Sequence, residues 1–175
     1  MEGDMAKLQP QDLTFADTAT LRIDARFDSP APPSAVFAVL ADHRGAIEWI
    51  GSGVSKIQPT STPEEGVGAT RTVWFFGGLG RLDETFIAWD EPTVWSFTGT
   101  AFRPGVFTKF VERVSLEPSG GDGCRITYRL ALETRPAIRP LDGIIRRVLA
   151  WQPPRVLASL SSAASRRHPA DDWQR

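Results

Sequence analysis

Residues 81–100, RLDETFIAWDEPTVWSFTGT, predict two antiparallel strands joined by a tight turn. Side chains that suit a buried face recur at every second position on both sides of the turn, which is the period of a strand. The residues that share this predicted inner face are Leu82, Glu84, Phe86, Ala88, Trp95, Phe97 and Gly99. The turn, Asp-Glu-Pro at 90–92, has the composition of a chain reversal. The segment is therefore the predicted centre of an antiparallel sheet.

The same alternation extends outward in both directions. Residues 66–76 predict a strand before the centre, with Thr70, Thr72, Trp74 and Phe76 on its inner face. Residues 108–116 and 124–132 predict two strands after it, and weaker or more distant strands are predicted at 54–58 and 21–28. The loops between residues 66 and 132 are short, so consecutive strands are expected to pair antiparallel.

Helices are predicted on either side of these strands. A short helix begins at the prolines 32–33, which suit a first helical turn, and a second short helix or turn covers 42–49. From Ile138 to residue 165 the apolar spacing is helical, with a stripe that includes Ile144, Ile145, Val148 and Leu149. Pro153 and Pro154 cannot continue the backbone hydrogen bonding, so this helix should bend or break near Gln152.

The chain is predicted to hold one domain, an α+β fold over residues 18–165. Residues 1–17 lack periodicity and are predicted to form a flexible N-terminal arm, and 166–175 a flexible tail. Large rings crowd the predicted inner face of the sheet. One curved sheet and one long helix cannot easily pack so many rings without gaps, so a cavity of a few hundred Å³ is expected between them.

Composition excludes several classes of protein. The formal net charge is −1, which gives no reason to expect a nucleic-acid partner. No apolar run is long enough to span a membrane, and no signal peptide is recognised, so a cytoplasmic location is expected. Cys124 is the only cysteine, which rules out an internal disulfide and a cysteine-based zinc site. No metal or cofactor is predicted, and a monomer or weak homodimer is expected.

Charge is unevenly distributed along the chain. From Thr134 onward there are eight arginines against three aspartates. This segment is interpreted as a solvated basic helix or as a docking face for an anionic partner or membrane surface.

Several short motifs occur in an order that resembles the START-like, or Bet v 1-like, superfamily. The first is Pro32–Asp42 followed by Glu48-Trp49, and the second is Gly66-Val67-Gly68-Ala69-Thr70-Arg71. The third is Leu82-Asp83-Glu84 followed by Asp90-Glu91-Pro92. The bacterial SRPBCC polyketide cyclase/dehydrase and lipid-transport branch is the most similar, over roughly residues 18–165.

The resemblance implies a helix-grip fold. In that fold a curved seven-stranded antiparallel sheet wraps around a long C-terminal helix, with two short helices after the first strand. It also implies a cavity that holds lipids, polyketides or other apolar molecules, and in some members a cyclisation or dehydration. Such folds host many activities, so the resemblance indicates the fold more specifically than the function.

Three residues are candidates for chemistry. Glu84 on an apolar face could act as a general acid or base, and the resemblance adds that a strand glutamate lines the pocket in several members. Alternatively it pairs with an arginine such as Arg71 or Arg113, or lies near solvent. Tyr128 could orient a ligand carbonyl or be an ordinary core residue. His43 could shuttle protons at the pocket rim or lie on the surface.

The predicted ligand-binding surface consists of the large inward side chains and two positions on the last helix. Its members are Trp49, Trp74, Phe76, Phe86, Trp95, Phe97, Phe110, Glu112, Tyr128, Ile145 and Leu149. Any of the rings could instead be core, and Glu112 has the same alternatives as Glu84.

Three functions remain open from the sequence. The first is a binder of a small hydrophobic ligand beneath the C-terminal helix. The second is a polyketide cyclase or dehydratase that uses Glu84. The third is a protein-interaction module of the same fold, which an exposed apolar patch would favour. The sequence leans toward binding without catalysis.

Overall fold

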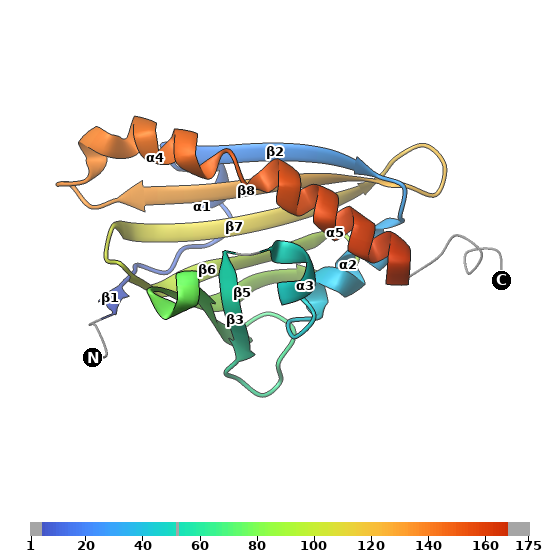
Figure 1. Ribbon diagram of the computed structural model, residues 1–175, viewed down its shortest axis with the longest axis horizontal. Helices are drawn as coiled ribbons and strands as arrows, with labels where there is room; N and C mark the ends of the chain where they lie inside the picture. Colours follow the sequence, from blue (N-terminus) through green and yellow to red (C-terminus); the bar gives the residue numbers. More distant parts are fainter. Residues whose placement is uncertain (1–4, 52, 168–175) are drawn as a thin grey trace.

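One long antiparallel sheet dominates the computed structural model, which describes residues 5–51 and 53–167 (Figure 1). Seven strands follow the order β2-β8-β7-β6-β5-β4-β3, and an eighth, β1, pairs with β6. Their bounds are β1 Ala6–Lys7, β2 Leu21–Ser29, β3 Val54–Pro59, β4 Thr70–Phe75, β5 Gly80–Asp90, β6 Val94–Arg103, β7 Phe107–Pro118 and β8 Cys124–Thr134. The predicted α+β fold with sequential antiparallel pairing is confirmed.

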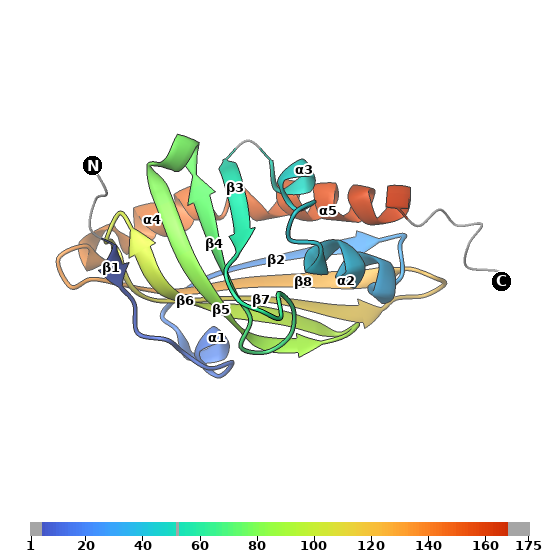
Figure 2. The same ribbon diagram turned by 90° about the horizontal axis from the view of Figure 1, so that it is seen from below.

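Helices cover one face of this sheet (Figures 1 and 2). Their bounds are α1 Phe15–Thr18, α2 Pro33–Ala41, α3 Ile47–Ile50, α4 Asp142–Leu149 and α5 Pro153–Arg167, with single 3₁₀ turns η1 Phe76–Gly78 and η2 Arg139–Leu141. The longest helix, α5, packs against α2, α3 and β2. The exception is α1, which lies on the opposite face of the sheet (Figure 2). Apart from this helix the arrangement is the helix-grip that the sequence predicts.

The C-terminal helix breaks where its two prolines predict. Helix α4 ends at Leu149 and α5 begins at Pro153, whose missing N–H costs nothing in a first helical turn. The predicted apolar stripe lies on α4, and only part of it is buried. Ile145 and Leu149 pack against the core, whereas Ile144 and Val148 are more than 60% exposed. The break at the prolines separates α4 from α5, which carries the buried side chains Leu157 and Leu160.

The assignment of the two faces of β4 was wrong by one residue. Arg71 is opposite Glu84 and Val73 is opposite Leu82, so these β4 side chains point into the core. Trp74 is opposite Arg81 on the outer face, where Lys56 and Arg81 lie over its ring. Both parities of this strand carry apolar residues, so alternation alone could not choose between them. Arg71 can face inward despite its charge because it pairs with Glu84, which is also buried.

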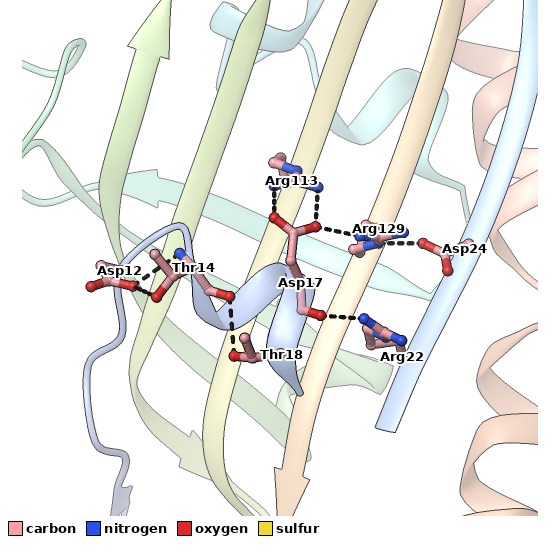
Figure 3. A network of polar contacts seen from close by, with 8 residues as sticks. All are labelled: Asp12, Thr14, Asp17, Thr18, Arg22, Asp24, Arg113 and Arg129. Carbon is pink, nitrogen blue, oxygen red and sulfur yellow. Dashed lines mark hydrogen bonds and ion pairs between the residues drawn. The ribbon is translucent and has the colours of Figure 1, made fainter. Parts of the chain in front are cut away.

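The N-terminal segment is held to the sheet rather than forming the flexible arm that was predicted. The backbone N–H of Leu8 donates to the carbonyl of Thr100, and Phe15 and Ala16 are buried against β7 and β8. Figure 3 shows the polar contacts around α1, where Asp17 accepts from Arg113 at 2.8 and 3.0 Å. The correction applies to residues 5–17. At the other end, Arg166 and Arg167 belong to α5, and the remaining predicted tail lies outside the described residues.

Phe15→Ala is expected to destabilise the protein by about 3 kcal/mol, because it removes the largest side chain of the cluster that anchors α1. Denaturant unfolding measures the loss. The exposed neighbouring substitution Thr20→Ala should leave stability nearly unchanged. If Phe15→Ala were as stable as the wild type, this cluster would not anchor α1, and the prediction of a flexible N-terminal arm would stand.

Candidate functional site

A charged cluster is buried inside the grip between the sheet and the helices. Arg71 on β4 and Glu84 on β5 are directly opposite in the strand register, and each is at most 5% exposed. Arg71 Nε donates to Glu84 Oε2 at 2.5 Å. The other side of the guanidinium approaches His43, which follows α2, with 3.1 Å between Arg71 Nη1 and His43 Nδ1. Arg71 therefore links strands β4 and β5 to the segment that follows helix α2.

Aromatic rings enclose this arginine. Its Cζ lies 5.2 Å from the ring centre of Phe86, 5.0 Å from that of Trp95 and 5.2 Å from that of Phe97. The faces of these rings attract a cation, more strongly where water is excluded. The rings also pack edge to face on one another, with centres 5.2 to 6.0 Å apart. The cluster is thus a cation and a carboxylate inside an apolar, aromatic wall.

The charge states of the pair follow from its burial. Burial raises the pKa of Glu84, and the Arg71 guanidinium opposes that rise by favouring the ionised carboxylate. A guanidinium does not lose its proton in proteins, so Arg71 needs a buried anion. Glu84 is therefore best placed as the counter-ion of Arg71, which is one of the alternatives that the sequence left open.

A second carboxyl group lies on the same inner face. Glu112 on β7 accepts a hydrogen bond from the hydroxyl of Tyr128 on β8 at 2.9 Å. Burial, with the nearby charge of Glu84, raises the pKa of Glu112 to about 7, against the opposing effects of Tyr128 and Arg71. Burial and the same two carboxylates also raise the pKa of Tyr128 well above its usual value. Glu84 and Glu112 are thus two buried carboxyl groups on one face, each with a raised pKa.

His43 is buried, contrary to the surface alternative. Burial and the positive charge of Arg71 lower its pKa to about 4, so the ring is neutral at pH 7. Because Arg71 can only donate, His43 Nδ1 accepts, and Nε2 carries the hydrogen that is donated to the carbonyl of Glu64 at 3.0 Å. Both ring nitrogens are thereby occupied, and the geometry suits a residue that positions Arg71.

Two polar atoms in this interior have no partner among the described residues. They are the indole Nε1 atoms of Trp95 on β6 and Trp49 on α3. Buried N–H groups are almost always satisfied in native proteins, because an unpaired one costs about 1–3 kcal/mol. Each of these donors is consistent with an acceptor that the polypeptide does not supply.

Two hollows lie at the margins of the fold. One of about 380 Å³ lies between α3 and α5 and is lined by Trp49, Glu48, Ala158, Ser159, Ser162 and Arg166. The other, of about 890 Å³, lies under the N-terminal segment and is lined mainly by residues 10–14 and by β5 and β6. Neither is the cavity predicted between the rings and the last helix, because those rings pack on each other.

Most of the predicted site residues do come together. Trp49, Phe86, Trp95, Phe97, Phe110, Tyr128, Ile145 and Leu149 belong to one apolar core, and Glu84, Glu112 and His43 lie against it. Trp74 and Phe76 do not: Trp74 lies on the outer face, and Phe76 is 65% exposed in the β4–β5 turn. The central residue, Arg71, was named from the sequence only as one possible partner of Glu84 and not as a site residue, although it ends the motif Gly66–Arg71.

The arrangement of His, Cys, Asp and Glu side chains bears on metal binding. Within residues 5–51 and 53–167, no group of three or more His, Cys, Asp or Glu side chains is arranged to hold one.

Comparisons with known proteins agree with this architecture. Residues 20–164 match the profile of the family described as polyketide cyclase / dehydrase and lipid transport. A solved protein of Thermus thermophilus is 19% identical with a TM-score of 0.69, over 84% of this chain and 99% of that one. The Zhui aromatase/cyclase from a Streptomyces species is 17% identical with a TM-score of 0.66, over 86% and 96%.

A third solved structure has the same fold. Norcoclaurine synthase from Thalictrum flavum is 16% identical with a TM-score of 0.63, over 85% of this chain and 93% of that one. No curated protein matched the sequence. At identities this low, the similarity of the structures shows a shared fold and supports no further conclusion about chemistry.

Proposed function

This chain belongs to the polyketide cyclase/dehydrase and lipid-transport family, and we propose that it binds one small hydrophobic molecule with a polar acceptor group between the sheet and α5. The observation that carries the proposal is the buried Trp95 Nε1, an unpaired donor on the inner face that also holds Arg71 and Glu112. An apolar wall with a few convergent polar groups is the usual composition of a small-molecule site.

The acceptor group of the ligand would be a carbonyl, ether or hydroxyl oxygen. Trp95 Nε1 can only donate, and a protonated Glu112 can donate as well. A ligand without such an oxygen would leave the indole N–H unpaired, at a cost of about 1–3 kcal/mol. The preferred ligand is therefore apolar over most of its surface and has an oxygen at one end.

The hollow beside Trp49 supports a route to this interior. It lies between α3 and α5, which are in contact, and Trp49 belongs to the core that also contains Trp95. The rings around Arg71 are closely packed, so a ligand that reaches them must shift α3 or α5. The free energy of that shift lowers the apparent affinity.

Two matched aromatic compounds test the proposal. They are 2-acetonaphthone, which has a carbonyl, and 2-ethylnaphthalene, which has nearly the same shape without one. Quenching of tryptophan fluorescence should give at least tenfold tighter binding of the ketone. Trp95→Phe should abolish most of that preference while the unfolding midpoint confirms a folded protein. Equal affinity for both compounds, or no binding of either, would contradict the proposal.

A second candidate function is catalysis, and the pKa of Glu112 favours it. A carboxylate with a pKa near 7 can take a proton from a carbon next to a carbonyl and later return it to the product. Arg71, held by Glu84 and His43, would stabilise the negative oxygen formed by that proton transfer. In this version of the cyclase hypothesis Glu112 is the acid–base group and Glu84 positions Arg71.

A further inference from the structure

Helix α4 presents an apolar strip to the outside of the molecule. Ile144, Val148 and Trp151 are each 63% or 64% exposed, and Leu141 in η2 is 47% exposed. At helical spacing, these residues fall on neighbouring positions of one side. Ile145 and Leu149 pack against the core beside them, so the strip continues the buried face outward. Large exposed apolar patches on a protein surface mark interaction sites.

Positive charge surrounds this strip. Residues 135–155 contain five arginines, at 135, 139, 146, 147 and 155, and one acidic residue, Asp142. Arg139 is paired with Glu133 at 3.8 Å, Arg155 lies over the Trp151 ring at 4.1 Å, and among the described residues no ion pair is seen for Arg146 or Arg147. Asp142 accepts a hydrogen bond from Thr134 at 2.7 Å and lies on the inner side of the helix. The surface around α4 is therefore basic.

The place of α4 in the fold leaves it accessible. Figures 1 and 2 show it at one end of the molecule, along the edge formed by β2 and away from α2 and α3. Both views place the β4–β5 turn, with the exposed Phe76 and Leu79, toward the same end. Among the described residues no helix is long and apolar enough to cross a membrane. If α4 attaches the protein to a membrane, the helix would therefore lie along the membrane surface.

We propose that α4 docks this protein onto an anionic lipid bilayer. An amphipathic helix with arginines beside an apolar face and an interfacial tryptophan has the composition of helices that lie in the headgroup region. A second copy of the chain is a poorer occupant, because a two-fold contact would bring two arginine-rich surfaces together. The proposal does not depend on what the interior binds.

Vesicle flotation at low and high salt tests the docking. The wild type should float with vesicles of phosphatidylcholine and phosphatidylglycerol, float at least tenfold less with phosphatidylcholine alone, and dissociate at high salt. Ile144→Asp/Val148→Asp should abolish flotation, and Arg146→Glu/Arg147→Glu should reduce it about tenfold or more. All four side chains are exposed, so thermal unfolding should be unchanged.

A matched control and a second readout complete the test. Val67 is 69% exposed on the loop before β4, so Val67→Asp should float like the wild type. Vesicles with brominated acyl chains should quench the wild type more than Trp151→Phe, because Trp151 is expected to enter the bilayer. Failure of the wild type to float would overturn the proposal. Light scattering that shows a dimer abolished by Ile144→Asp/Val148→Asp would assign the strip to a second copy instead.

Discussion

Arg71→Met is expected to destabilise the protein by about 3–5 kcal/mol, the usual cost of breaking a buried ion pair. The substitution removes the guanidinium that faces Glu84 at 2.5 Å and leaves that carboxyl group buried without a counter-charge. It also removes the cation from the three rings that surround it. Denaturant unfolding with a constant m-value measures the loss.

Two control variants distinguish the effect of breaking the buried ion pair from the general effect of removing an arginine. Arg44 and Glu64 form an ion pair on the surface, with the Arg44 side chain 72% exposed, so Arg44→Met should leave stability nearly unchanged. The double variant Arg71→Met/Glu84→Leu should recover much of the loss, since no buried charge remains. A cost for Arg71→Met as small as that for Arg44→Met would show that Arg71 is not the centre of the cluster.

Glu112→Gln is expected to stabilise the protein at pH 8 by about 3 kcal/mol and at pH 5 by less than about 1 kcal/mol. Burial raises the pKa of Glu112 to about 7, from 4.5 in the unfolded chain. Between these values the folded state binds more protons than the unfolded state, so wild-type stability falls as pH rises toward 7 and then levels off. Glutamine stays neutral and can still accept from Tyr128.

The same substitution tests catalysis. If Glu112 transfers protons, Glu112→Gln should lower any cyclase rate by about 10²-fold or more while the ligand still binds. Glu133→Gln is the matched surface control: Lys109 lowers the pKa of Glu133, so its replacement should give no gain in stability at pH 8. Equal responses of the two variants to pH would contradict the pKa given to Glu112.

Strand alternation predicted most of the fold because β8 carries its large apolar residues on one parity, and β5 and β6 alternate clearly over Leu82–Phe86 and Trp95–Phe97. It failed on β4, where Val73 and Phe75 compete with Trp74 and Phe76 and only the pairing of Arg71 with Glu84 decides the face. It also failed at residues 5–17, whose burial depends on contacts with β6, β7 and β8 that are distant in sequence.

The sequence indicated which residues could form the candidate site better than it indicated what each residue does. Glu84, Glu112 and Tyr128 were candidates because polar groups on an apolar strand face are conspicuous in a sequence, and His43 was a candidate from its place after the first short helix. Their roles depend on distances between strands. The bond from Arg71 favours Glu84 as a counter-ion, whereas burial and the charge of Glu84 raise the pKa of Glu112 to about 7. Periodicity contains no information on such pairings.

Native mass spectrometry of the protein isolated from the organism that makes it tests whether a ligand is held against Trp95. We expect one small molecule bound per wild-type chain, released on denaturation, with occupancy reduced at least tenfold in Trp95→Phe/Tyr128→Phe. Val67→Asp should retain the molecule like the wild type. A wild-type chain that carries nothing, or equal occupancy in the wild type and the interior double variant, would contradict a ligand held against Trp95 between the sheet and α5.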